Sequence, residues 1–277
     1  MNQLDEDKSC PMQADKEPKI RPLEELLKLL RREFPFYHND TYHAVDGFLN
    51  HDGRFTEAVY ESAILNLARR LIVHTQYIAK KSAKTVDPET VKESLYRTFR
   101  VQSLDAPDQL VNLVYECYKY SLKKLPNGTK NSVKKNSRSN NSNCYICGVA
   151  LTYADPNLDT FHEAEHILPR SLGGSNFHSN LKGACKRCNN FKDSRINGAD
   201  LHYEYMVYPF TEIGPKKLRD YHLFAARLFN NHACTECGRP AELAGELEVF
   251  QISDSDSWNL FNTMLLCVQC ASKLTAN

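Results

Sequence analysis

Eight of the ten cysteines stand in four Cys-x-x-Cys pairs, a spacing typical of metal ligands. The alternative, free thiols in a reduced core, does not explain why the spacing recurs four times. Two such pairs complete a tetrahedral four-thiolate zinc site, which leaves the metal no open position and makes it structural. The pairs therefore predict two structural zinc sites, formed by Cys144, Cys147, Cys185 and Cys188 and by Cys234, Cys237, Cys267 and Cys270.

The segment that begins at the first cysteine pair and ends just past the second holds the groups that phosphodiester hydrolysis needs. Such a reaction requires a base to take a proton from water and a cation to neutralise charge on the phosphoryl oxygens. His166 can be the base, because an imidazole titrates near neutral pH. A hard divalent ion prefers oxygen ligands, which the Glu165 carboxylate and the Asn189 amide carbonyl would supply.

This segment resembles the HNH (ββα-metal) endonuclease family, in a subtype stapled by zinc. Thirteen residues separate His166 from Asn180, and eight separate Asn180 from Asn189, as in that family. The resemblance covers roughly 55 residues and is carried by Glu165, His166, Pro169, Gly173, Gly174, Asn180 and Asn189. It implies a strand, a loop, a second strand and a helix. It also implies that His166 ends the first strand, that Asn189 lies on the helix, and that Asn180 orients the loop and His166.

The last motif position indicates the catalytic ion. The family often has His there, whereas this chain has Asn189. Replacing an imidazole with an amide oxygen disfavours Zn²⁺ or Ni²⁺ and favours Mg²⁺ or Mn²⁺. The expected cofactors are therefore Mg²⁺ or Mn²⁺ for catalysis and two structural Zn²⁺.

Positive charge is concentrated in the middle of the chain. Residues 123–203 carry a net charge of +6, whereas residues 1–122 carry −2 and residues 204–277 carry −3. A polyanion would bind the middle third. The resemblance implies that this polyanion is DNA, with RNA as the alternative. The candidate phosphate contacts, each of which could instead be a solvated surface charge, are Arg170, Lys182, Lys186, Arg187 and Lys192.

The sequence predicts an α+β protein in four segments. Residues 21–125 show apolar residues at helical spacing and should form an all-helical domain for a partner or self-association. Residues 126–143 are rich in Asn, Ser and Lys, which predicts a flexible basic linker. Residues 144–198 form the HNH module, and residues 199–277 form a linking helix and a second small zinc module.

The second zinc module reads as a degenerate copy of the first. Asn262 lies five residues before Cys267, as Asn180 lies five before Cys185. Counting back from the second cysteine pair puts Glu248 at the place of His166, and Ala271 stands where Asn189 would be. The copy should therefore lack a catalytic site and supply a surface, for which its acidic balance favours a protein partner.

These observations favour a metal-dependent HNH endonuclease acting on DNA, in bacterial anti-phage defence or restriction. The alternatives are a non-catalytic zinc-dependent nucleic-acid adaptor and a homing endonuclease of a mobile element. A protein partner, for which an ATPase is one candidate, would bind the helical domain. The composition, 42% hydrophobic and 25% charged, is that of a globular protein. With no apolar run of membrane-spanning length, we expect no membrane association and a cytoplasmic location.

Overall fold

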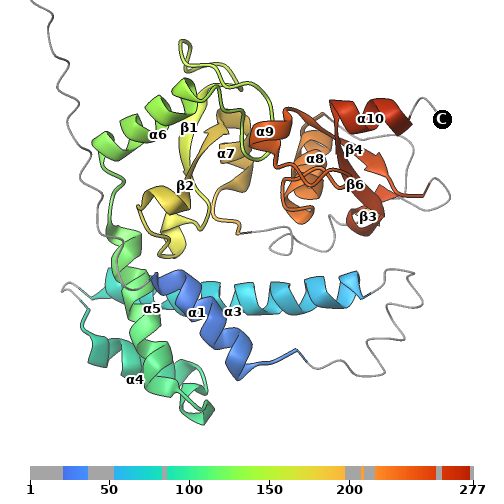
Figure 1. Ribbon diagram of the computed structural model, residues 1–277. Coiled ribbons are helices and arrows are strands. Elements are labelled where there is room, and N and C mark those ends of the chain that lie inside the picture. The colour runs from blue at the N-terminus through green and yellow to red at the C-terminus, as the bar shows by residue number, and fades with distance from the viewer. Residues whose placement is uncertain are drawn as a thin grey trace, which may run out of the picture.

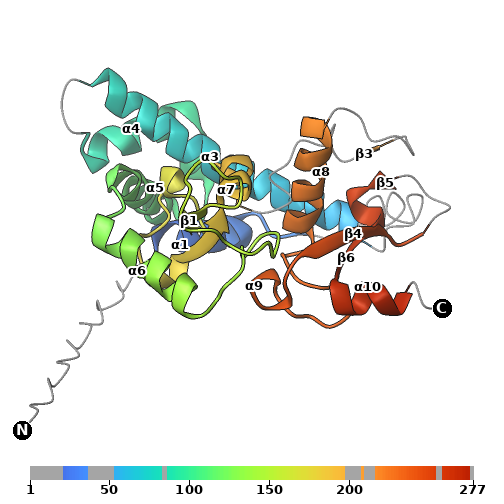
Figure 2. The ribbon, with the colours of Figure 1, turned by 90° about the horizontal axis from the view of Figure 1, so that it is seen from above.

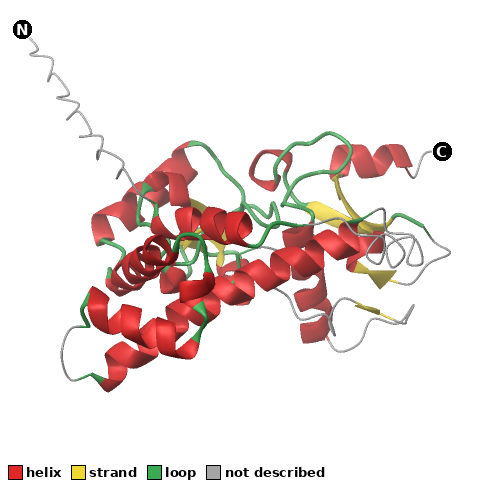
Figure 3. Ribbon diagram, turned by 90° about the horizontal axis from the view of Figure 1, so that it is seen from below, coloured by secondary structure: helices red, strands yellow, loops and turns green. Residues whose placement is uncertain are grey.

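The structure is a computed structural model that describes residues 21–36, 53–82, 86–196, 207–208, 216–253 and 258–274. The expected boundary at residue 198 lies outside these ranges. The fold is α+β, as predicted, with a helical layer beneath two small β-containing modules that lie side by side (Figure 1). Within the described ranges the strands are short and lie outside the helical layer (Figure 3). No helix in the described ranges is both long and apolar enough to cross a membrane.

The helices of the helical layer begin at residues that favour helix N-termini. Proline opens three of its helices, where a missing N–H costs nothing, and Asp87 caps one of them by accepting a 2.8 Å hydrogen bond from the Thr90 amide. Leucines at three- and four-residue spacing, such as Leu26 and Leu30, bury one face of each helix. The elements are α1 (Pro22–Glu33), α3 (Arg54–Lys81), α4 (Pro88–Thr98), η1 (Val101–Ser103) and α5 (Pro107–Leu122).

The helical layer and the first module share a core. Leu172 lies in η2 (Arg170–Leu172), within the first module's loop, and is buried in the leucine cluster of the helical layer. Gly173 follows with φ of +90° and lies against the α5 backbone, where a Cβ would come within 2.5 Å of the Cys117 Cα. The helical layer is thus a platform on which the loop of the first module is seated.

The segment predicted as a flexible linker instead forms α6 (Asn127–Ser139), and that prediction is corrected. Its few buried groups suffice to order it: Val133 is buried, and Ser137 lies against Gly183, whose missing side chain allows the close approach. A short polar helix is marginal alone, but packing against β1 and β2 stabilises it. Composition does not reveal this packing, because so few of its residues make it.

The first module is the ββα unit that the resemblance implied. Strand β1 (His162–His166) pairs antiparallel with β2 (Leu181–Cys185), in a register that places His166 opposite Leu181. The loop between them includes η3 (His178–Asn180). Helix α7 (Lys186–Lys192) follows β2 directly, so the second cysteine pair sits at the junction of strand and helix.

The second module repeats this order. After α8 (Lys216–Phe229) and the short α9 (Ala241–Ala244), β4 (Leu247–Gln251) pairs antiparallel with β6 (Thr263–Cys267), and α10 (Val268–Leu274) follows. The turn η6 (Leu260–Asn262) corresponds to η3, and a further short pair joins β3 (Val207–Tyr208) to β5 (Trp258–Asn259). The chain therefore contains two copies of one unit.

The register of the copy corrects one expected equivalence. Gln251 pairs with Thr263, four residues before Cys267, just as His166 pairs with Leu181, four before Cys185. Gln251, and not Glu248, therefore replaces His166. Counting back from the cysteines failed because the loop between the strands, residues 252–262, is three residues shorter than residues 167–180. The replacement of Asn189 by Ala271 holds in both alignments.

Helix α3 connects the two modules from below (Figure 2). Its C-terminal half packs on α5 and η2, while Phe55 and Ala58 near its N-terminus join a cluster with Ala225 of α8 and Phe261 of η6. The rings of Phe55 and Phe261 meet edge to face at 5.6 Å. One helix therefore fixes the relative positions of both modules.

Candidate active site and zinc sites

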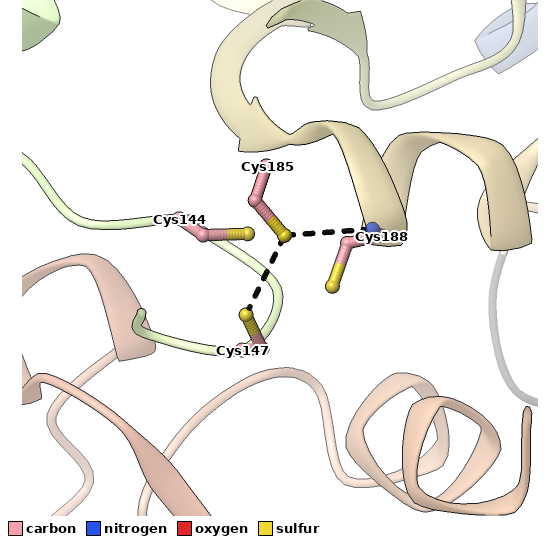
Figure 4. Close-up of side chains that lie close together, drawn as sticks. All are labelled: Cys144, Cys147, Cys185 and Cys188. Carbon is pink, nitrogen blue, oxygen red and sulfur yellow. Dashed lines mark hydrogen bonds between the residues drawn. The ribbon is translucent and has the colours of Figure 1, made fainter. Parts of the chain in front are cut away.

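The first four cysteines point toward a common centre (Figure 4). All four are buried, and their sulfurs lie within 4.8 Å of one another, with 3.8 Å between the Cys147 and Cys185 Sγ atoms. Four sulfurs bound tetrahedrally to zinc at about 2.3 Å would be about 3.8 Å apart. The residues therefore fit a structural zinc ion.

Local backbone geometry explains how the first site forms. The Gly148 amide donates to the Cys144 carbonyl, and Gly148 has φ of +75°, so the first cysteine pair lies on a tight turn. On the other side, Cys185 caps α7, with the Cys188 amide 3.5 Å from its Sγ. Turn and helix start thus bring the two pairs face to face.

The second site has the same geometry but is more open. The Cys237 and Cys267 sulfurs are 3.9 Å apart, and Cys237 is exposed. The guanidinium of Arg239 contacts both sulfurs, at 3.5 and 3.7 Å, and lowers the pKa of Cys237 to about 6. A positive group thus lies beside thiolates that would give a zinc complex net negative charge.

Two carboxylates of β1 lie on the side that faces α7. Residues two apart on a strand share a face, so Glu163 and Glu165 point the same way. The Asn189 amide donates to the Glu163 carboxylate, while Glu165 accepts a 2.8 Å bond from Lys192 Nζ. Asn189 is therefore paired with Glu163, which our sequence analysis missed, and not with Glu165. The period of two along the strand was the signal that could have found Glu163.

Lys192 is not placed to contact a phosphate, and this prediction is corrected. The residue is 1% exposed, and its ammonium lies 2.8 Å from Glu165 Oε1 and 2.7 Å from the His166 carbonyl oxygen. Burial raises the pKa of Glu165, and the Lys192 charge opposes that rise. Lys192 therefore fastens α7 to the end of β1, where the candidate catalytic groups lie.

His166 is held in one orientation and one tautomer. The Asn176 amide donates its own N–H to the Lys124 carbonyl, which turns Oδ1 toward His166 Nε2 at 2.8 Å. Nε2 must then carry the proton, and Nδ1 is left as the acceptor. Burial lowers the pKa of His166 below 6.5, so the ring is neutral at pH 7. A neutral imidazole with a fixed acceptor nitrogen has the properties of a general base.

The side chain of Asn180 holds the loop by bonding to the backbone of the loop. Its amide donates to the Leu168 and Ser175 carbonyls at 3.0 and 2.8 Å, and its Oδ1 accepts from the Leu168 amide. Asn262 makes the corresponding pair of bonds to Ser253 in the second module, both at 2.9 Å. These contacts hold the loop, whereas the side chain that touches His166 belongs to Asn176, which sequence reasoning missed. The orienting role of Asn180 in catalysis stays a prediction.

The other candidate phosphate contacts are engaged within the protein. Arg170 donates to the Ser121 carbonyl at the end of α5, and Lys186 donates to the Pro156 carbonyl. Lys182 forms an ion pair with Glu242 of α9 at 2.7 Å, and Arg187 is half-buried. These bonds tie neighbouring elements together, and phosphate contact by these four residues stays a prediction.

The site thus combines a ββα unit whose four cysteines fit zinc, a histidine held by Asn176, and a carboxylate–amide pair between β1 and α7. The sequence model of the HNH endonuclease family matches residues 144–199, and the chain thus carries an HNH endonuclease domain. Comparison with curated proteins and with solved structures gave no match.

Proposed function

We propose that this protein is a metal-dependent endonuclease that hydrolyses DNA phosphodiester bonds at the end of β1. The observation that carries the proposal is the setting of His166, whose neutral ring is held through Nε2 by Asn176 and whose backbone carbonyl shares the Lys192 ammonium with the Glu165 carboxylate. His166 Nδ1 takes the proton from the attacking water. The oxygen of that water forms the new bond to phosphorus while the bond to the leaving oxygen breaks.

The residues fit a hard divalent ion, Mg²⁺ or Mn²⁺. Glu163 and Asn189 bring a carboxylate and an amide into contact, and rotation of the Asn189 amide would turn its oxygen toward the same point. These two residues would hold the ion, with Glu165 the next carboxylate on the same strand face. When bound, the ion would neutralise charge that develops on the phosphoryl oxygens.

Glu165 has a different role in this proposal from the one its motif position suggested. Its carboxylate is largely buried and bound to Lys192, so it positions α7 and thereby Asn189. It serves the ion through this arrangement, and Glu163 becomes the direct ligand. Mutating each carboxylate separately would therefore give different results.

A metal-dependent plasmid-cutting assay tests the proposal. The parent should nick supercoiled plasmid with Mg²⁺ or Mn²⁺ and not with EDTA. His166→Ala should lower the rate by about 10²–10⁴, because a general base contributes that much. Equal zinc content in parent and variant is the control for folding. A variant that cuts as fast as the parent would rule out His166 as the base.

We further propose that cutting serves bacterial defence against phage or other foreign DNA, with the helical layer binding a partner protein. Val73 and Tyr77 support a docking face, because they lie one turn apart on α3 and are 48% and 53% exposed. Phage plating on cells that carry the parent or His166→Ala tests this role. Equal plaque numbers would argue for another role, such as mobile-element homing.

A further inference from the structure

Helix α6 carries a row of positive charge. Lys130, Lys134 and Arg138 recur every four residues, which places them on one side of the helix, about 6 Å apart along its axis. Lys130 and Arg138 are exposed and Lys134 is half-buried. The helix contains no acidic residue. Lys135 and the preceding Lys123 and Lys124 add to the charge.

This row has no compensating charge in the described part of the chain. None of its three cations takes part in an ion pair among the described residues, although several other surface lysines and arginines do. Like charges four residues apart destabilise a helix by about 0.2–0.5 kcal/mol per pair. A charge pattern that opposes the stability of its own helix is explained when an anion binds there.

The row is also held in place. Lys134 Nζ lies 5.3 Å from the centre of the Phe161 ring, and the Arg138 guanidinium lies 5.9 Å from that of Tyr153. Beneath the row, the Ser137 hydroxyl is hydrogen-bonded to His162 Nε2 at 3.3 Å. The cations are therefore presented from a docked helix, and less side-chain freedom would be lost on binding.

Helix α6 covers the face of β1 that ends at His166. His162 and His166 share a strand face, and His162 is the one that contacts α6. Beside α6, a groove of about 870 Å³ extends to the 176–183 segment and α9, and its wall includes the amides of Asn136, Asn140 and Asn176. Asn176, which forms part of the groove wall, is also the hydrogen-bond partner of His166.

We propose that α6 binds the phosphodiester backbone of the DNA substrate, through Lys130, Lys134 and Arg138, on the strand that passes His166. This inference rests on the proposed function and specifies how substrate is held. It also replaces the phosphate contact expected of Lys192, which is buried. The amide-lined groove would receive the sugars and bases next to the bound backbone.

The test compares two charge-matched triple variants of the full-length chain. Lys130→Gln, Lys134→Gln and Arg138→Gln remove three charges from α6. Arg70→Gln, Lys80→Gln and Lys81→Gln remove three exposed charges from α3. Binding of a fluorescent DNA duplex is followed by anisotropy in EDTA over a range of salt. The α6 variant should bind more weakly, with a salt slope smaller by about 2 to 3, because each phosphate contact contributes about 0.9 to that slope.

Each outcome decides the inference. The α3 variant should bind DNA like the parent. If both variants lose the same DNA affinity, the loss comes from net charge alone and the proposal is overturned. An α6 variant that binds like the parent would also overturn it, while plasmid cutting by the parent would leave the proposed function intact. A parent that neither binds nor cuts DNA would overturn both. Tighter binding to an RNA of the same sequence would overturn the assignment of DNA as substrate. Equal zinc content and circular dichroism are required of both variants.

Discussion

The protonation state of His166 determines how cutting should depend on pH. Its base form is the neutral ring, so activity is lost as pH falls through the His166 pKa. Burial lowers that pKa below 6.5, so the acid limb of the kcat profile should have its midpoint below pH 6.5. Asn176→Ala removes a bond that raises the pKa, and the midpoint should fall further while the rate drops. An acid midpoint above 7 would contradict this assignment.

Replacing Lys192 tests how much its buried ion pair with Glu165 stabilises the protein. Lys192→Met leaves the Glu165 carboxylate largely buried without its ammonium, which should lower the free energy of unfolding by about 3–5 kcal/mol. Adding Glu165→Gln removes the stranded charge and should recover part of that loss. Chemical denaturation of the parent, both single variants and the double variant measures the coupling. Additive effects would mean that the two groups do not interact.

At the residue scale, motif spacing predicted the positions of residues that lie at or near the ends of strands, loops and helices. His166, Asn180 and the cysteines lie where strand, loop and helix boundaries were expected, because the motif fixes their separations. Spacing could not choose between Glu163 and Glu165, since both face α7 and the choice depends on how the helix sits. Asn176 was missed because a loop has no periodicity to place its side chains.

At the element scale, the contact between α6 and β2 depends on Gly183. A Cβ there would meet the Ser137 Oγ at 2.6 Å, so Gly183→Ala should displace α6 and cost about 1–3 kcal/mol. Hydrogen exchange of the α6 amides should become faster and DNA should bind more weakly. Gly128→Ala, in the same helix with open space around it, is the control.

The second substitution in this test identifies the cause. Ser137→Ala in the Gly183→Ala background removes the clashing oxygen and should restore much of the protection of α6. If protection stays low in the double variant, the loss comes from strain in β2 and not from contact with α6. The sequence could not predict helix α6, because a helix with so little apolar content depends on packing against β1 and β2 for its stability.

At the scale of the whole molecule, the two zinc sites should respond differently to mutation. The parent should contain about two zinc ions, and Cys185→Ser or Cys267→Ser about one. Cys185→Ser should abolish cutting by releasing the start of α7, while Cys267→Ser should leave reduced cutting. Elemental analysis and the plasmid assay measure both. Full activity in Cys185→Ser would show that the first zinc does not support the site.

The sequence predicted two modules but not their contact. The Leu247 amide donates to the Cys147 carbonyl at 3.1 Å, and a Cβ on Gly148 would overlap the Gly245 carbonyl. No sequence motif indicates a backbone contact between segments as far apart as those of Gly148 and Gly245. We expected the second module to be a separate partner surface, yet one side of it supports the first zinc turn, and this is why Cys267→Ser should reduce cutting.

That backbone contact would couple zinc binding at the two sites. Cys147 would be a ligand of one zinc ion, and its carbonyl accepts a hydrogen bond from Leu247 at the start of β4 in the other module. Filling either site would order the shared contact and raise the affinity of the other, and thermodynamic linkage requires any such effect to be equal in both directions. The exposed Cys237 site would then act as an allosteric site for zinc availability, since zinc loss there would loosen the ligands of the buried ion beside the candidate nuclease centre.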